Sequence, residues 1–96
     1  MKVLASNEIA NKWGCKFSKV VEFEDGKKFK ITHSTGNCFS NTDIYVMLPD
    51  LSWAEVADGF DISAESINYV LSEEFKRGMM ADIYKKAIEY IEAVFI

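Results

Sequence analysis

The segment from Phe17 to His33 constrains the fold most, because apolar and charged side chains alternate along it on either side of Asp25-Gly26. Alternation with a period of two is typical of a β-strand with one buried face. An Asp-Gly pair between two such runs is a common turn in antiparallel hairpins. The sequence therefore predicts a β-hairpin at the centre of the fold.

The register of this hairpin follows from the same alternation. A loop over 25–27 yields four cross-strand pairs, two of them apolar on one face and two of opposite charge on the other: Phe23–Phe29, Val21–Ile31, Glu22–Lys30 and Glu24–Lys28. Pairs of this kind each favour a sheet by about 0.2–1 kcal/mol. We therefore expect one apolar face that packs in the core and one charged face.

The flanking segments complete an α+β fold. Ser6 is a suitable N-cap and Gly14 lies where a helix commonly ends, so we expect an N-terminal helix between them. The apolar run 43–48 predicts the third strand of an antiparallel sheet. Three helices are expected after it, over about 52–59, 63–78 and 79–95. We expect residues 1–96 to form a single domain, with these helices on one face of the sheet.

The first two of these C-terminal helices resemble a helix-turn-helix unit. In the stretch SWAEVADGFDISAESINYVL, Ser52 and Glu55 form a capping box, and Ile62 follows a short turn. Asp61 stands where such units usually carry glycine. A single long helix is an alternative, but it would point Ile62 into solvent, so we expect a break near 59–62.

The net charge of −4 conceals an uneven distribution of charge along the chain. Residues 1–30 carry seven lysines and four acids, whereas residues 31–75 carry eight acids and no lysine or arginine. The eight acids are Asp43, Asp50, Glu55, Asp58, Asp61, Glu65, Glu73 and Glu74. If they share one face, that face would attract a basic partner.

The spacing of these acids suggests that such a partner normally binds nucleic acid. Four of them, from Glu55 to Glu65, recur at helical intervals, which places neighbouring carboxylates about 5–6 Å apart. Asp43 and Asp50 flank the predicted third strand and would extend the row. A row of negative charges at this spacing imitates the phosphates of a nucleic-acid strand and would compete for a groove that binds one.

In overall character the chain resembles small acidic phage-encoded inhibitors, among them the DNA-mimicking anti-CRISPR and anti-restriction proteins. The resemblance is carried by the chain length, by the acidic block over 31–75 and by the hairpin KVVEFEDGKKFKITHSTG before it. It implies a non-enzymatic protein that binds a basic nucleic-acid-binding protein or complex and blocks it.

The helix-turn-helix resemblance provides the alternative, a dimeric DNA-binding transcriptional regulator. Its second helix offers Ser66 and Asn68 for contacts to base edges, but no lysine or arginine before Lys76. Glu65 would repel the DNA backbone. A homodimer would use the apolar surface of the last helix, which would also suit a scaffold protein. The charge of the second helix makes the inhibitor our first expectation.

The sequence carries no signature of catalysis. His33 is in phase with Phe29 and Ile31, so we expect it to be half-buried, and Cys15 and Cys38 match no zinc-site spacing. We therefore expect no enzyme activity, no metal and no cofactor. The chain also lacks the run of roughly 18 apolar residues that a membrane helix needs. We expect a cytoplasmic protein with no membrane partner.

Overall fold

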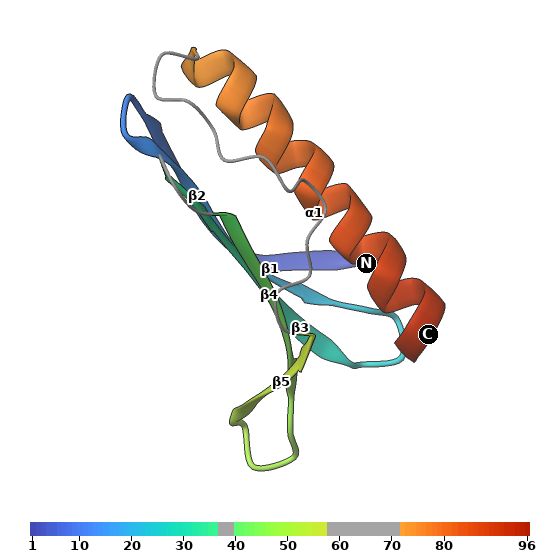
Figure 1. Cartoon of the computed structure of the whole chain (residues 1–96). Helices are drawn as coiled ribbons and strands as arrows, with labels where there is room; N and C mark the ends of the chain where they lie inside the picture. Colours follow the sequence, from blue (N-terminus) through green and yellow to red (C-terminus); the bar gives the residue numbers. More distant parts are fainter. Residues whose placement is uncertain (37–39, 58–71) are drawn as a thin grey trace.

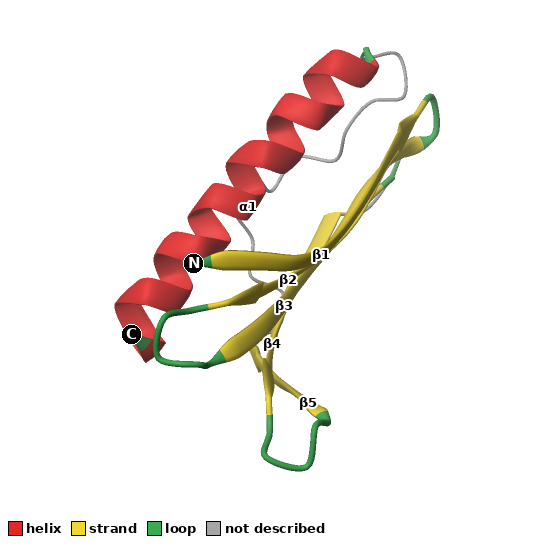
Figure 2. Cartoon of the chain, turned by 180° about the vertical axis from the view of Figure 1, so that it is seen from behind, coloured by secondary structure: helices red, strands yellow, loops and turns green. Residues whose placement is uncertain are grey.

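The computed structural model describes residues 1–36, 40–57 and 72–96. Within these ranges the chain forms a five-stranded antiparallel sheet followed by a helix. The elements are β1 (Lys2–Asn11), β2 (Gly14–Glu22), β3 (Lys28–Thr35), β4 (Ser40–Met47), β5 (Trp53–Ala57) and α1 (Glu73–Phe95). Each strand pairs with the next along the chain, so the sheet is a meander, and α1 lies along one of its faces (Figures 1 and 2).

The predicted N-terminal helix is wrong. The residues expected to form it, 6–13, belong to β1 and to the turn that joins β1 to β2. A short helix gains few hydrogen bonds to offset the cost of nucleation, whereas β1 pairs with β2 along almost its whole length. Gly14, expected just past the end of a helix, is instead the first residue of β2.

The turn between β1 and β2 requires glycine at Gly14. This residue has a φ of 154° and packs so tightly that an added Cβ would lie 2.1 Å from the Thr35 carbonyl oxygen of β3. The Asn11 side chain closes the turn by accepting a hydrogen bond from the Trp13 backbone at 2.8 Å. The close approach of Gly14 to β3 therefore fixes how this end of the sheet packs.

β2 and β3 form the predicted hairpin, but the predicted register is wrong by two residues. Val21 pairs with Phe29, and Glu22 pairs with Lys28. Because the register is shifted by an even number of residues, each residue still lies on its predicted face of the sheet. Val21 and Phe29 are fully buried, whereas Glu22 and Lys28 form an ion pair of 3.8 Å on the opposite face.

The shift originates in the turn, which is centred one residue earlier than the prediction. The Phe23 N–H donates to the Lys27 carbonyl at 2.9 Å, so the loop is 24–26. The Gly26 N–H donates to the Phe23 carbonyl at 2.9 Å, and Gly26 adopts a positive φ of 88°. A turn followed by a left-handed glycine is the usual form of a three-residue hairpin loop.

The predicted helix over 52–59 is also wrong, because β5 occupies most of this segment. Ser52 does not cap a helix. Its backbone N–H and its hydroxyl donate to the Asp50 carboxylate at 3.0 and 2.5 Å, within the turn before β5. Trp53 and Val56 favour a strand, and β5 pairs with β4 along Trp53, Ala54, Glu55 and Ala57. The helix-turn-helix-like pair thus lacks its first helix, and most of its second, up to residue 71, lies outside the described residues.

α1 is one continuous helix where the sequence predicts an end near Gly78. Open space surrounds Gly78, and its penalty of about 1 kcal/mol in a helix is small beside the gain from burying an apolar face. The residues of that face are Met80, Ile83, Ala87 and Ile91. Ser72 caps the helix, since its hydroxyl accepts a hydrogen bond from the Phe75 N–H at 3.1 Å.

The core lies between α1 and one face of the sheet. Phe29, Ile31 and Ile44, from β3 and β4, are fully buried, and the Phe29 ring lies 5.4 Å from the ring of Phe95. The apolar surface of the last helix that a homodimer would use is therefore largely buried inside the fold. The large apolar side chains of the α1 region that remain exposed are Phe75, Val94 and Ile96.

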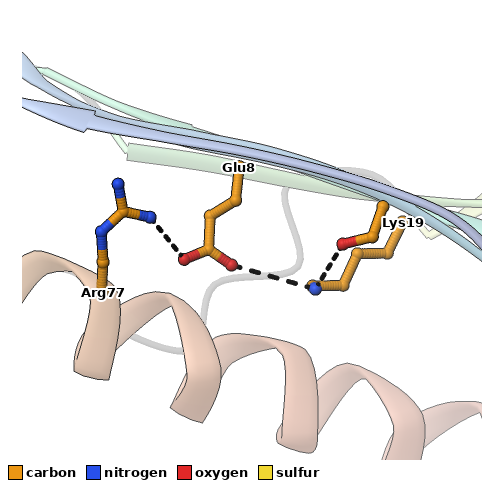
Figure 3. A network of polar contacts seen from close by, with 4 residues as sticks. Glu8, Lys19 and Arg77 are labelled. Atoms are coloured by element: carbon orange, nitrogen blue, oxygen red, sulfur yellow. Dashed lines mark hydrogen bonds and ion pairs between the residues drawn. The ribbon is translucent and has the colours of Figure 1, made fainter.

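A polar network joins α1 to the sheet beside the core (Figure 3). One carboxylate oxygen of Glu8 accepts from Arg77 of α1 at 3.0 Å, and the other lies 3.9 Å from Nζ of Lys19 on β2. Lys19 also donates to the Ser6 hydroxyl at 2.8 Å. Exposed pairs of this kind contribute about 0–1 kcal/mol each, so the network positions α1 more than it stabilises the fold.

We expect Gly14→Ala to lower the free energy of unfolding by about 2–4 kcal/mol, because the new Cβ collides with backbone that cannot move freely. Urea denaturation measures the change. Gly78→Ala is the matched control, since it adds the same atom in open space within a helix, and it should stabilise by about 0.5–1 kcal/mol. Equal stabilities of the two variants would contradict this account of the turn.

Candidate binding surface

The face of the sheet opposite α1 is uncovered within the described ranges, and we call it the open face (Figure 2). The strand registers place on it Lys2, Ala5, Asn7, Ile9, Lys16, Ser18, Val20, Glu22, Lys28, Lys30, Thr32, Ser34, Asn41, Asp43, Tyr45, Met47, Trp53 and Glu55. None of these side chains is buried. The open face is the largest surface of the described sheet that is available to a partner.

The structure places the described acids of the predicted row at three separate locations. Asp43 and Glu55 lie on the open face, on β4 and β5. Asp50 lies in the turn between these strands, and Glu73 and Glu74 form the first turn of α1. That turn and the start of α1 lie at opposite ends of the molecule (Figure 1). The described acids therefore do not form one row.

The middle of the predicted row, Asp58, Asp61 and Glu65, lies outside the described residues. Glu55 was expected to precede Asp58 at a helical interval, but it belongs to β5. The helical interval that would have linked Glu55 to these acids therefore does not apply.

Two of the described acids are engaged by their own neighbours. Hydrogen bonds from the Ser52 hydroxyl and backbone lower the pKa of the Asp50 carboxyl. The Asp43 carboxylate accepts a hydrogen bond from the Asn41 side chain at 2.9 Å. These contacts hold both carboxylates in local structure.

The lysines of the N-terminal third are a stronger feature of the open face than the acids. Together with Lys12 in the adjoining β1–β2 turn, five lysines accompany three carboxylates there. Lys28 pairs with Glu22 at 3.8 Å. The other four lysines form no ion pair with a described residue: Lys2, Lys12, Lys16 and Lys30. The open face thus carries an excess of positive charge on a chain that is negative overall.

One of these lysines is held between two aromatic rings. The Lys30 ammonium lies 4.7 Å from the centre of the Tyr45 ring and 5.2 Å from that of Trp53. Cation–π contacts at exposed sites contribute about 0.5–1 kcal/mol each. Because the three residues come from three strands, the stack holds a cation and two rings in place on the open face.

Two adjoining hollows lie on the open face close to the β1–β2 turn. Their volumes are about 300 and 340 Å³, and they share Ile9, Lys16 and Ser34. We call the combined hollow the Lys16 groove. Its remaining lining residues are Asn7, Asn11, Trp13, Gly14, Cys15, Phe17, Ser18, Thr32, His33, Thr35 and Gly36. No aspartate or glutamate is among the lining residues, so the groove suits an anionic group.

Trp13 stands at one end of the Lys16 groove and was not identified from the sequence as a binding residue. It is 67% exposed, and the Lys12 ammonium lies 4.6 Å from the centre of its ring. The helix expected between Ser6 and Gly14 would have included it. The alternation of Cys15 and Phe17 with Lys16 would have predicted a strand here, and hence a turn around Trp13.

A polar cluster is buried on the other face of the sheet, beneath α1. Nδ1 of His33 lies 2.8 Å from the Thr42 hydroxyl, and the other ring nitrogen contacts the Thr35 hydroxyl. The ring stacks on Phe17 at 5.7 Å. His33 is on the predicted face, but it is buried rather than half-buried, with 3% of its surface exposed. Most of its ring is thus enclosed by the fold.

Cys15 lies close to this cluster, but its surroundings do not activate it. Burial raises the pKa of the Cys15 thiol, and the nearby Lys76 ammonium opposes this shift only in part. A nucleophilic cysteine needs the opposite shift, toward the thiolate. Among the described residues, no three histidine, cysteine or acidic side chains gather as metal ligands would.

No protein-family model matches the sequence, and neither a curated protein nor a solved structure is significantly similar to it. α1, the described helix, is not apolar enough over a sufficient length to span a membrane. The function must therefore be inferred from the residues and their geometry.

We expect the free energy of unfolding to fall as the pH rises above about 9, because burial raises the pKa values of Cys15 and Tyr84 from their ordinary 9.0 and 10.0. Both groups are neutral when protonated. Their contribution is complete below the ordinary values and is lost as the pH rises through the raised ones. Urea denaturation from about pH 8 to about pH 11 measures the loss.

Tyr84→Phe separates this effect from the general loss of lysine charge at high pH. The Tyr84 hydroxyl is buried and has no hydrogen-bond partner among the described residues. The variant should therefore match the wild type at neutral pH within about 1 kcal/mol and lose less stability at alkaline pH. An unchanged alkaline slope would contradict the assignment.

Proposed function

We propose that this protein is a non-enzymatic interaction protein that binds an anionic partner through its open face. The observation that supports this most is that the two faces of the sheet carry different kinds of side chain. α1 packs on one face, and the other face, uncovered within the described ranges, carries three lysines that no described carboxylate pairs, with a fourth, Lys12, in the adjoining turn. Unpaired cations on a rigid surface are suited to recognising a negative partner.

The apolar side chains of the open face also favour binding. Tyr45, Met47 and Trp53 belong to residue types that are enriched at protein interfaces, and they are partly exposed here. Lys30 is already held by two rings, so it loses little conformational freedom when it contacts a partner. The proposed surface thus combines preorganised charge with apolar area.

We expect the protein to be retained on heparin, a polyanion, at low salt despite its net charge of −4. Lys12→Glu/Lys16→Glu should abolish retention, because it reverses two unpaired lysines on and beside the open face. Chromatography over a salt gradient measures the effect. Retention should weaken steeply with salt, since the Debye length shrinks to about 8 Å at physiological ionic strength.

The matched control is Lys85→Glu/Lys86→Glu, which changes the net charge equally on an exposed part of α1. It should leave retention near the wild-type value. Loss of retention in both double variants would mean that overall charge governs binding, and no retention of the wild type would refute the proposed anionic partner.

The second candidate function is the DNA-mimic inhibitor expected from the sequence, which would block a basic nucleic-acid-binding protein. The observation that favours it is the absence of lysine and arginine from residues 31–75, where eight acids lie. Two of them, Asp43 and Glu55, are on the open face. In this case the acidic segment, rather than the lysines, would carry the affinity.

Reversing Asp58, Asp61 and Glu65 to lysine separates the two candidates. For a mimic, the triple variant should lose all binding to a basic nucleic-acid-binding partner recovered from the native host, while Lys12→Glu/Lys16→Glu should retain it. Co-purification of that partner with each variant measures this. If the triple variant still co-purified with that partner, the DNA-mimic function would be refuted.

We assign the proposed binding to the cytoplasm. Cys15 is a free thiol, which is the state that the cytoplasm maintains.

A further inference from the structure

The Lys16 groove has a lining whose chemistry is more specific than that of the open face as a whole. Lys16 supplies a cation, and Asn7, Ser18, Thr32 and Ser34 supply amide and hydroxyl groups from three neighbouring strands. Lysine, serine, threonine and asparagine are among the side chains that hydrogen-bond the phosphates and sugars of nucleic acids. A carboxylate-free lining of this composition favours a phosphate-bearing ligand.

Trp13 adds a surface on which a base can stack. A tryptophan that is 67% exposed leaves a large apolar ring in water unless a partner covers it. Proteins that bind single strands combine basic grooves with aromatic side chains, because every base has a flat face for stacking. The Lys12 ammonium lies over one face of the same ring, so a base would stack on the other face with this second cation close by.

We propose that the Lys16 groove binds single-stranded nucleic acid, with one base stacked on Trp13 and the adjoining phosphates near Lys12 and Lys16. This inference rests on the proposed function and narrows its partner. Hollows of about 300 and 340 Å³ are at the small end of ligand pockets, so they accept nucleotide-sized groups and not a duplex.

The exposed Trp13 ring distinguishes this partner from an acidic protein segment. Glutamate and aspartate side chains would satisfy the lysines, but they offer no flat ring for Trp13. Asp43, which lies opposite Thr32 on β4, would repel any anion, phosphates included. We therefore expect the bound nucleic-acid strand to follow the lysines near the β1–β2 turn and to avoid β4.

The test is the fluorescence anisotropy of a labelled oligo(dT) of about 20 nucleotides, titrated with the full chain at several salt concentrations. Trp13→Ala should weaken binding by about five-fold or more. Lys16→Gln should lower the log–log salt slope by about 0.7, the value for one phosphate contact on a single strand. Both side chains are exposed, so folding should be unaffected, and circular dichroism verifies this.

The matched controls are Phe75→Ala, which removes an aromatic side chain of similar exposure from α1, and Lys85→Gln. Both should bind oligo(dT) like the wild type. Equal loss in Trp13→Ala and Phe75→Ala would overturn the proposal, and so would tighter binding of poly-glutamate or of a duplex of the same length. Retention on heparin without oligo(dT) binding would refute this inference alone, whereas no retention on heparin would refute the proposed function itself.

Discussion

The packing of α1 on one face of the sheet is the constraint on which the remaining features of the structure depend. Its buried face, from Met80 to Ile91, covers the apolar sides of β2 and β3. A single helix covers only one side of a five-stranded sheet, so the strands beneath it carry their core residues on that side and must be compatible with water on the other. The open face is therefore a direct consequence of having one described helix for five strands.

This constraint also determines where the charges lie. In β2 and β3 the lysines alternate with core residues such as Phe17, Phe29 and Ile31, so the period of two places most of them on the open face. Lys19 is the exception, and it is neutralised beside Glu8. The acids of residues 31–75 follow no such period, and the described ones are distributed over a strand pair, a turn and a helix end.

The predictions that rested on the alternation of apolar and charged residues were right about the two faces of the hairpin. The predictions that rested on single residues typical of helix ends were wrong. The two faces of the β2–β3 hairpin were correct, because an apolar face must be buried wherever the turn falls. The strand predicted over 43–48 overlaps β4, but it is the fourth of five strands rather than the third of three. Ser6, Gly14 and Ser52 are common at helix ends but also at turns, and only the neighbouring strand decides between them. The lysines of the open face were missed because charge was counted along the chain rather than by face.

The net charge of the chain does not oppose an anionic ligand at the Lys16 groove. At physiological ionic strength an exposed charge acts over about 8 Å. A ligand in the groove is therefore affected more by the charges that line the groove than by the net charge of the chain. Glu8 is paired with Arg77 and Lys19, and Asp50 lies at the end of the molecule away from the groove. Glu73 and Glu74 stand at the positive end of the α1 dipole, which offsets part of their charge. A chain that is acidic overall can therefore present a face on which a polyanion is attracted.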